Sequence, residues 1–155
     1  MVEHRHEWLC RQIVDNTGDA VIFGDAEGKV RLWNAGAEQI FGFSADEIVG
    51  KSMDLIIPEN LRERHREGYD ETMRSGRTQY SRNLLAVPAL RKDGTRISIE
   101  FTIVLIRGED RKLLGPAAVL RDVTTRWNRD KELRKRIAAL EAEVAKLAGP
   151  TKSAS

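Results

Sequence analysis

The sequence predicts an α+β domain followed by a separate C-terminal helix. Two short apolar runs flank a turn near the N-terminus, and a long segment with helical spacing occupies the middle of the chain. Three runs rich in β-branched residues follow, one of them with regular alternation of apolar and polar side chains. This grouping indicates two strands, several short helices and then three antiparallel strands, which together form an α+β domain.

The N-terminal third is expected to form a helix, a strand pair and two very short helices. Asp25 and Gly28 supply the turn between two runs of β-forming residues. Ser44 and Glu47 have the spacing of a capping box, in which each end of the motif satisfies a backbone N–H of the other. The expected elements are a helix over 6–16, strands over 21–23 and 30–33, and short helices over 35–41 and 44–50.

A longer helix is expected to begin near Pro58 and to end at Ser75-Gly76. At helical spacing, Leu61, His65, Tyr69 and Met73 fall on one stripe, while nearly all charged residues fall elsewhere. The single histidine of this helix therefore lies within its apolar face.

The following segment is expected to form three antiparallel strands. A first strand over 80–90 leads to a hairpin marked by Asp93-Gly94. A second strand over 96–106 alternates regularly, and a last strand covers 115–123. The residues of the second strand expected to face inward are Ile97, Ile99, Phe101, Ile103 and Leu105.

The C-terminal segment has the pattern of a coiled coil. Its apolar residues alternate steps of four and three, the spacing of a and d positions, with charged residues off the seam. We expect this helix to pair as a parallel homodimer, with help from the apolar residues of the first helix. It is also expected to offer contact to an output domain or partner protein. The seam residues are Leu133, Ile137, Leu140, Val144 and Leu147.

Composition excludes several classes of protein. The 26 basic and 24 acidic residues are interleaved, so no basic stripe of the kind that binds nucleic acid directly is present. No apolar run is long enough to cross a membrane. Cys10 is the one cysteine and the N-terminus lacks a signal peptide, so a cytoplasmic location is expected. The phosphate-binding glycine loops and nucleophile elbows of enzymes are also absent, which predicts a non-enzymatic role.

The order of these elements and three motifs resemble a PAS domain over roughly residues 8–126. The motifs are GDAEGKVRLWNAGAEQIFGFSADEIVGK (24–51), RKDGT (91–95) and RDVT (121–124). The resemblance implies a five-stranded antiparallel sheet whose pocket is closed by short helices, in a sensor module that passes its signal to a C-terminal helix. It also implies that Asp122 and Thr124 couple sheet to helix. The alternative is that Asp122 starts a turn and Thr124 caps the helix.

This resemblance defines four regions of the chain. They are an N-terminal amphipathic helix (1–17), a PAS sensor domain (18–124), a coiled-coil signalling helix (125–148) and a disordered tail (149–155).

The stretch IIPENLRERHREGY (56–69) is similar to the corresponding helix of the heme-PAS oxygen sensors. In those proteins the helical histidine is the proximal iron ligand of heme b, and His65 matches its position. The residues also support this role, because an axial ligand must be a neutral imidazole facing an apolar pocket. The expected cofactor-binding residues are His65 as the iron ligand, with Gly68, Tyr69, Asn83, Leu85, Phe101 and Ile103 around it, and Arg62, Arg64 and Arg66 as candidates for the propionates.

Two functions stay open at this point. The oxygen sensors place an arginine on the strand after the helix, where this chain has Leu85, with Asn83 as the nearest polar candidate. Without heme, His65 would be a hydrogen-bonded core residue of a PAS interaction module, whose pocket is empty or holds an unknown small molecule. The flavin photoadduct of photosensor PAS domains is not expected, since residues 51–64 contain no cysteine.

Overall fold

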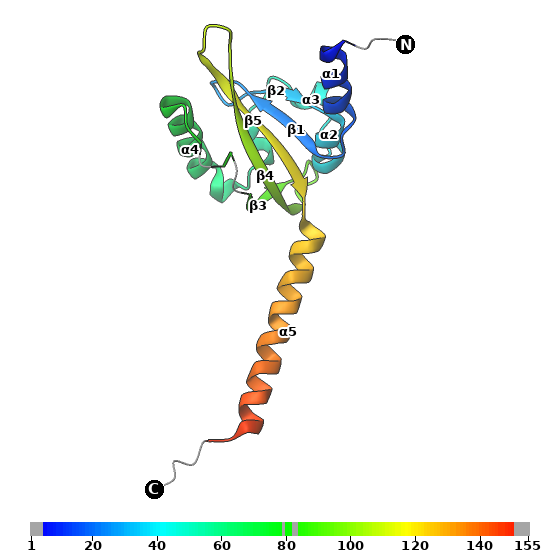
Figure 1. Cartoon of the computed structure of the whole chain (residues 1–155), viewed down its shortest axis with the longest axis vertical. Helices are drawn as coiled ribbons and strands as arrows, with labels where there is room; N and C mark the ends of the chain where they lie inside the picture. The colour runs from blue at the N-terminus through cyan, green and yellow to red at the C-terminus, as the bar shows by residue number, and fades with distance from the viewer. Residues whose placement is uncertain (1–4, 79, 82–83, 151–155) are drawn as a thin grey trace. The chain divides into compact units, whose positions relative to one another are not determined.

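The computed structural model describes residues 5–78, 80–81 and 84–150 of the chain (Figure 1). Asn83 and residues 151–155 of the expected tail therefore lie outside the described residues. The chain forms two units, residues 1–122 and residues 123–155. In order, the elements are α1 (His6–Asn16), β1 (Ala20–Gly24), β2 (Val30–Trp33), α2 (Ala35–Phe41), α3 (Ala45–Ile48), η1 (Met53–Ile56), η2 (Glu59–Leu61), α4 (Arg62–Ser75), β3 (Leu85–Leu90), β4 (Arg96–Arg107), β5 (Leu113–Asp122) and α5 (Thr124–Ala148).

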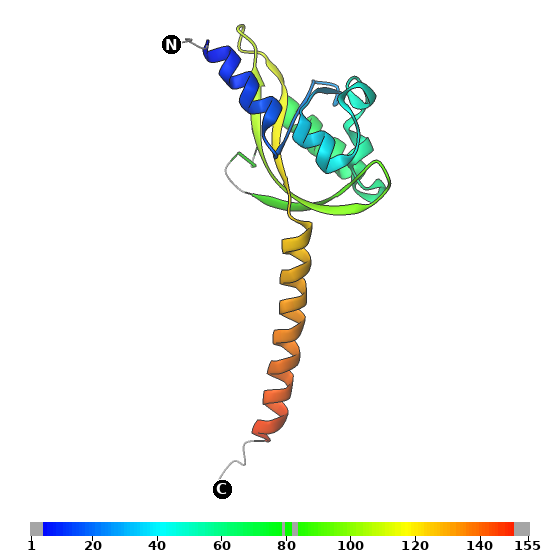
Figure 2. The ribbon, with the colours of Figure 1, turned by 90° about the vertical axis from the view of Figure 1, so that its right-hand side faces the viewer.

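The first unit contains one antiparallel sheet of five strands in the order β2-β1-β5-β4-β3. The N-terminal strand β1 therefore lies between β2 and the C-terminal strand β5, and β5 is the central strand of the sheet. In Figure 2 the helices of residues 35–75 gather on one side of the strands. The five-stranded α+β prediction is confirmed.

The core lies between one face of this sheet and the short helices. In β4, Ile97 and Ile99 are buried and the next inward residues, Phe101 and Ile103, are half-buried, as the alternation predicts. The sheet contributes its inner residues and α2, α3 and η1 cover them. The buried cluster is Ala20, Ile22, Val30, Trp33, Ala37, Phe41, Ile48, Ile56, Ala89, Ile97, Ile99 and Leu120.

Asn34 is the one buried polar side chain among the residues that the structure describes. Its Oδ1 accepts hydrogen bonds from the backbone N–H groups of Val21 and Ala37, which caps the N-terminus of α2. Its Nδ2 donates to the carbonyls of Val14 and Asp19. One side chain thus joins the end of α1, the start of β1 and the start of α2.

Several local predictions are confirmed and two boundaries differ. The capping box between Ser44 and Glu47 is present, and α4 ends at Gly76 in the left-handed conformation expected of a C-terminal glycine. The expected strand over 80–90 begins only at Leu85, because pairing of β3 with β4 stops at Phe101. The apolar link before α4 forms two 3₁₀ turns, so α4 begins at Arg62, four residues after Pro58.

The second unit consists of the single helix α5 and the residues after it. All five seam residues, from Leu133 to Leu147, are exposed on this helix. Thr124 is its first helical residue and Val123 occupies the N-cap position, so the alternative role of Thr124 as the cap is wrong. The helix ends at Ala148.

Candidate functional site

Helix α4 covers the sheet loosely. The predicted stripe of Leu61, His65, Tyr69 and Met73 is half-buried, whereas most other α4 residues are exposed. No residue of α4 is fully buried. The spacing of the stripe therefore predicted the inward face correctly, but the packing against this face leaves its side chains partly accessible.

The His65 imidazole is neutral at neutral pH and forms no hydrogen bond to the other described residues. Burial lowers the pKa of His65, and this effect exceeds the opposing attraction of the Asp54 carboxylate. The ring lies 6.0 Å from the Tyr69 ring, centroid to centroid, at a tilt of 49°. Within the described part of the chain, no hydrogen bond joins the His65 side chain to another residue. The alternative of a core histidine satisfied by a carbonyl or by tyrosine is therefore not what the structure shows.

Tyr69 holds α4 against the turn between β1 and β2. Its hydroxyl donates a 2.5 Å hydrogen bond to the carbonyl of Asp25, and burial raises the pKa of the phenol. Gly24 allows this close approach, since a Cβ at that position would lie 2.6 Å from the Tyr69 oxygen and 2.6 Å from Met53 Cε. Tyr69 is thus an anchor for the helix rather than a hydrogen-bond partner of His65.

Two of the three arginines considered for heme propionates have other partners. Arg62 Nε donates to the carbonyls of Asp54 and Ile57, at 3.2 and 3.1 Å. The guanidinium of Arg66 forms an ion pair with the Asp54 carboxylate, at 2.6 Å. Arg64 is exposed. The role of Asp54 was missed in the sequence, because it depends on the 3₁₀ turn that brings Asp54 under α4.

The sheet side of the expected site is apolar. Phe101 and Ile103 are half-buried on the inner face of β4, and the Tyr80 ring packs edge-on against Phe101 at 5.8 Å. Leu85 lies in β3 and its backbone pairs with Phe101. Gly68 is exposed, and a Cβ built there would meet nothing within 4 Å. The inward residues of β4 thus offer partly accessible apolar surface, and α4 has open space at Gly68.

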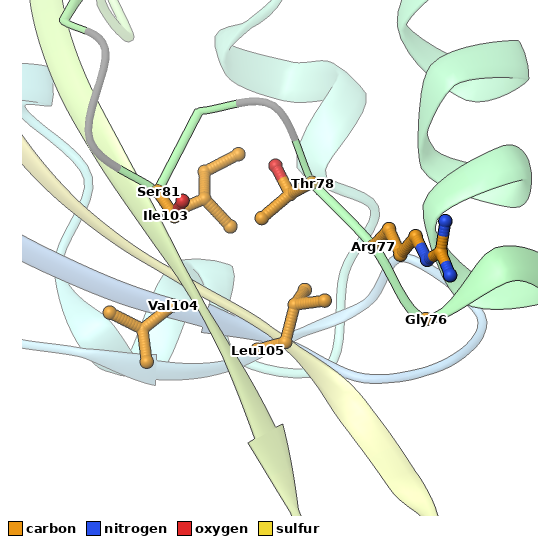
Figure 3. Close-up of a pocket in the computed structure, with 7 residues that line it drawn as sticks. All are labelled: Gly76, Arg77, Thr78, Ser81, Ile103, Val104 and Leu105. Atoms are coloured by element: carbon orange, nitrogen blue, oxygen red, sulfur yellow. The ribbon is translucent and has the colours of Figure 1, made fainter.

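An open cleft lies beyond the C-terminal end of α4 (Figure 3). Its volume is about 470 Å³. We call it the α4–β4 cleft, because one side comes from the segment after α4 and the other from β4. Its lining residues are Gly76, Arg77, Thr78, Ser81, Ile103, Val104 and Leu105. Of these described lining residues, only Ile103 also belongs to the residues predicted around the cofactor.

The expected junction residue Asp122 takes part in an ion pair. Arg91, at the start of the β3–β4 hairpin, places Nη2 2.9 Å from Asp122 Oδ2. The same hairpin contacts the short helices, since Lys92 forms an ion pair with Glu47 and its backbone N–H donates to the carbonyl of Phe41. The hairpin therefore connects α2 and α3 to the end of β5, the last residue before the second unit.

Other candidate chemistry is not evident in the described residues. None of their helices is long and apolar enough to cross a membrane. Within the same residues, no group of three or more His, Cys, Asp or Glu side chains could hold a metal ion. Cys10 is a free, exposed cysteine on α1.

Comparisons with known proteins agree with this architecture. The family model described as "PAS fold" matches residues 9–123. An uncharacterised protein of Azorhizobium caulinodans is 33% identical over 117 residues, which are 75% of this chain and 16% of that protein. The chain thus spans about a sixth of the length of this relative.

Two solved structures show the same fold at low sequence identity. The PAS domain of a protein from Colwellia psychrerythraea has a TM-score of 0.66 at 23% identity, covering 76% of this chain and 96% of that one. An RNA-binding light-oxygen-voltage receptor has a TM-score of 0.69 at 19% identity, covering 90% of this chain and 38% of that one.

Proposed function

This chain belongs to the PAS family, and we propose that it is a cytoplasmic sensor module that binds heme b through His65. In this proposal the module senses a diatomic gas or a redox state and relays the change through a dimer of α5. The observation that carries it is the state of His65: a half-buried, neutral imidazole on the inner side of α4 with no hydrogen-bond partner among the described residues.

The residues around His65 fit a flat, mostly apolar group. A neutral imidazole nitrogen is the ligand that heme iron takes from histidine. Phe101 and Ile103 supply apolar surface from the sheet, and Gly68 leaves open space on the helix. When bound, heme supplies an iron centre with a free coordination position and a reversible redox couple. Arg64 is the remaining propionate candidate of the three on α4, since Arg62 and Arg66 bind groups of η1.

The relay part of the proposal rests on α5. Its five apolar seam residues are exposed along one stripe, and a continuous stripe of this kind on a 25-residue helix needs a partner surface. A second copy of the helix offers the complementary a/d stripe. We therefore propose a homodimer through α5, which passes the signal to an output domain or partner protein.

A second candidate function is a heme-free PAS interaction module. The observation that favours it is that Arg62 and Arg66 already have partners, so the helix offers fewer free cations for the heme propionates. Under this alternative, dimerisation through α5 remains and the pocket is empty or holds an organic molecule.

The test is the absorption spectrum of protein produced with ample heme precursor. The proposal predicts about one heme bound per chain and a Soret band that shifts on reduction and on addition of carbon monoxide. His65→Ala should lose or displace the band, and added imidazole should restore it in part. His6→Ala is the matched control, because it removes an exposed imidazole from α1 and should leave the spectrum unchanged. A colourless protein that takes up no hemin, or a His65→Ala spectrum equal to that of the native chain, would refute heme ligation by His65.

A further inference from the structure

We propose that the α4–β4 cleft binds a small organic monocarboxylate with an apolar body. This site lies apart from His65. Gly76, at the near edge of the cleft, follows His65 by three helical turns, which is about 16 Å along the helix axis. His65 is not among the residues that line the cleft.

The walls of the cleft are held at two points. Arg107 Nη2 donates to the carbonyl of Gly76 at 3.1 Å, and the backbone N–H of Ile103 donates to the carbonyl of Tyr80 at 3.1 Å. Gly76 and Tyr80 are therefore each bonded to β4. A recess between two such attachments persists without a ligand, so little ordering is needed on binding.

The floor of the cleft is aliphatic and its upper wall is polar. In Figure 3 the side chains of Ile103, Leu105 and Thr78 point toward the same space, whereas Val104 points to the other side of β4. Thr78 Oγ1 accepts a hydrogen bond from the Tyr80 backbone N–H, which leaves the hydroxyl proton of Thr78 to donate to a ligand. A ligand that fits this lining has a hydrocarbon part and a hydrogen-bond acceptor.

The charges at the rim select an anion. Arg77 is exposed, and its guanidinium forms no ion pair with any residue that the structure describes. In Figure 3 it extends along the end of α4, from where rotation of its long side chain reaches the opening. Arg107 adds a second guanidinium whose described partners are the neutral carbonyls of Gly76 and Arg111. None of the described residues that line the cleft is acidic.

These features identify the chemical class. Planar carboxylates pair well with a guanidinium. Arg77 has no ion pair among the described residues and suits a single negative charge, whereas Arg107 is already bonded to the carbonyls of Gly76 and Arg111. The aliphatic floor favours an organic body over inorganic phosphate or sulfate. The volume of about 470 Å³ lies within the range of small-molecule pockets.

The experiment is a titration of the full chain with sodium octanoate, followed by ¹H–¹⁵N correlation spectra. Saturable shifts are expected at the amides of Thr78, Ser81 and Leu105. Arg77→Gln should weaken binding at least tenfold, because it removes a charge-assisted hydrogen bond. Arg96→Gln is the matched control, since it removes the same charge from an exposed position at the other end of β4 and should leave binding unchanged.

Ligand variants test the two halves of the proposal. Octanamide keeps the hydrocarbon and removes the charge, so it should bind at least tenfold more weakly. Butyrate should also bind more weakly, by about fourfold for each methylene no longer buried. Equal binding of octanamide and octanoate, equal binding by Arg77→Gln protein, or shifts centred on Tyr69 instead of Thr78 would each overturn the assignment.

This inference stands or falls independently of heme. His65→Ala protein should still bind octanoate, and Arg77→Gln protein should still give the heme spectrum. Loss of octanoate binding in His65→Ala protein that remains folded by circular dichroism would show that the ligand occupies the His65 region, which also contradicts the proposal.

Discussion

Replacing Asn34, the buried polar side chain among the described residues, by alanine should strongly destabilise the domain. The four hydrogen bonds of Asn34 have lengths of 2.8, 2.9, 2.8 and 3.0 Å, and the side chain is 5% exposed. Each such bond contributes about 1 kcal/mol net, so the variant should lose about 4 kcal/mol of unfolding free energy. For a domain of this size that corresponds to a fall in Tm of about 8–16 °C.

The assay is urea unfolding followed by far-ultraviolet circular dichroism. Asn34→Asp keeps the acceptor that caps α2 but turns an oxygen toward the carbonyls of Val14 and Asp19, so it should lose at least half as much stability. Asn60→Ala, at an exposed position in η2, is the control and should change the free energy of unfolding by less than about 0.5 kcal/mol. A loss below about 1 kcal/mol in Asn34→Ala would refute the reasoning, because buried backbone groups would then be satisfied without this side chain.

Three further predictions concern the hairpin and α5. The pKa of Glu47 is lowered to about 2, first by the bonded Lys92 ammonium, so the stabilisation that it gives is complete above pH 4.5 and is lost as the pH falls toward 2. Glu47→Gln should therefore flatten the fall of the urea midpoint between pH 4.5 and 2. Asp122→Asn should lower the unfolding free energy by about 1–2 kcal/mol in thermal melts, because it breaks the half-exposed pair with Arg91, while a change of less than 0.5 kcal/mol would contradict this. Because the proposed homodimer pairs through the α5 seam, Ile137→Asp should lower the mass in sedimentation equilibrium from dimer to monomer, whereas Ala139→Asp, off the seam, should leave it unchanged.

The sequence predicts periodic features of this fold well. The half-buried stripe of α4 and the alternation of β4 follow from side-chain geometry within one element, so the spacing of apolar residues suffices to identify them. The same holds for the capping box at Ser44, whose two partners are three residues apart. These features need no information about distant parts of the chain.

Features that depend on distant segments were not predictable in the same way. An asparagine before a short helix indicates an N-cap, but the bonds of Asn34 to Val14 and Asp19 exist only once α1 and β1 have been placed. Asp54 forms an ion pair with Arg66 because a 3₁₀ turn brings Asp54 under α4. The spacing of these residues in the sequence does not predict this contact. The cleft beside Leu105 likewise depends on two long-range hydrogen bonds that hold Gly76 and Tyr80 against β4.

The protonation of His65 is the property on which the proposed iron ligation most directly depends. Burial lowers the pKa of His65 below 6.5, the nearby Asp54 carboxylate raises it, and the Arg66 guanidinium lowers it. Asp54→Asn removes the carboxylate and also releases Arg66 from its ion pair, so both changes should lower the pKa of His65 further. An NMR titration of the imidazole CH resonances measures this pKa directly, and a rise of the pKa in Asp54→Asn protein would contradict the electrostatic reasoning.

The protonation of His65 also makes the stability of the domain depend on pH. Because the unfolded chain binds the proton more readily, the stability that depends on neutral His65 is complete above pH 6.5 and is lost as the pH falls toward the folded pKa. A His65→Gln variant should lack this loss of stability between the unfolded-state and folded-state pKa of His65. If the native protein instead became more stable on acidification, His65 would not be the neutral iron ligand that the proposal needs.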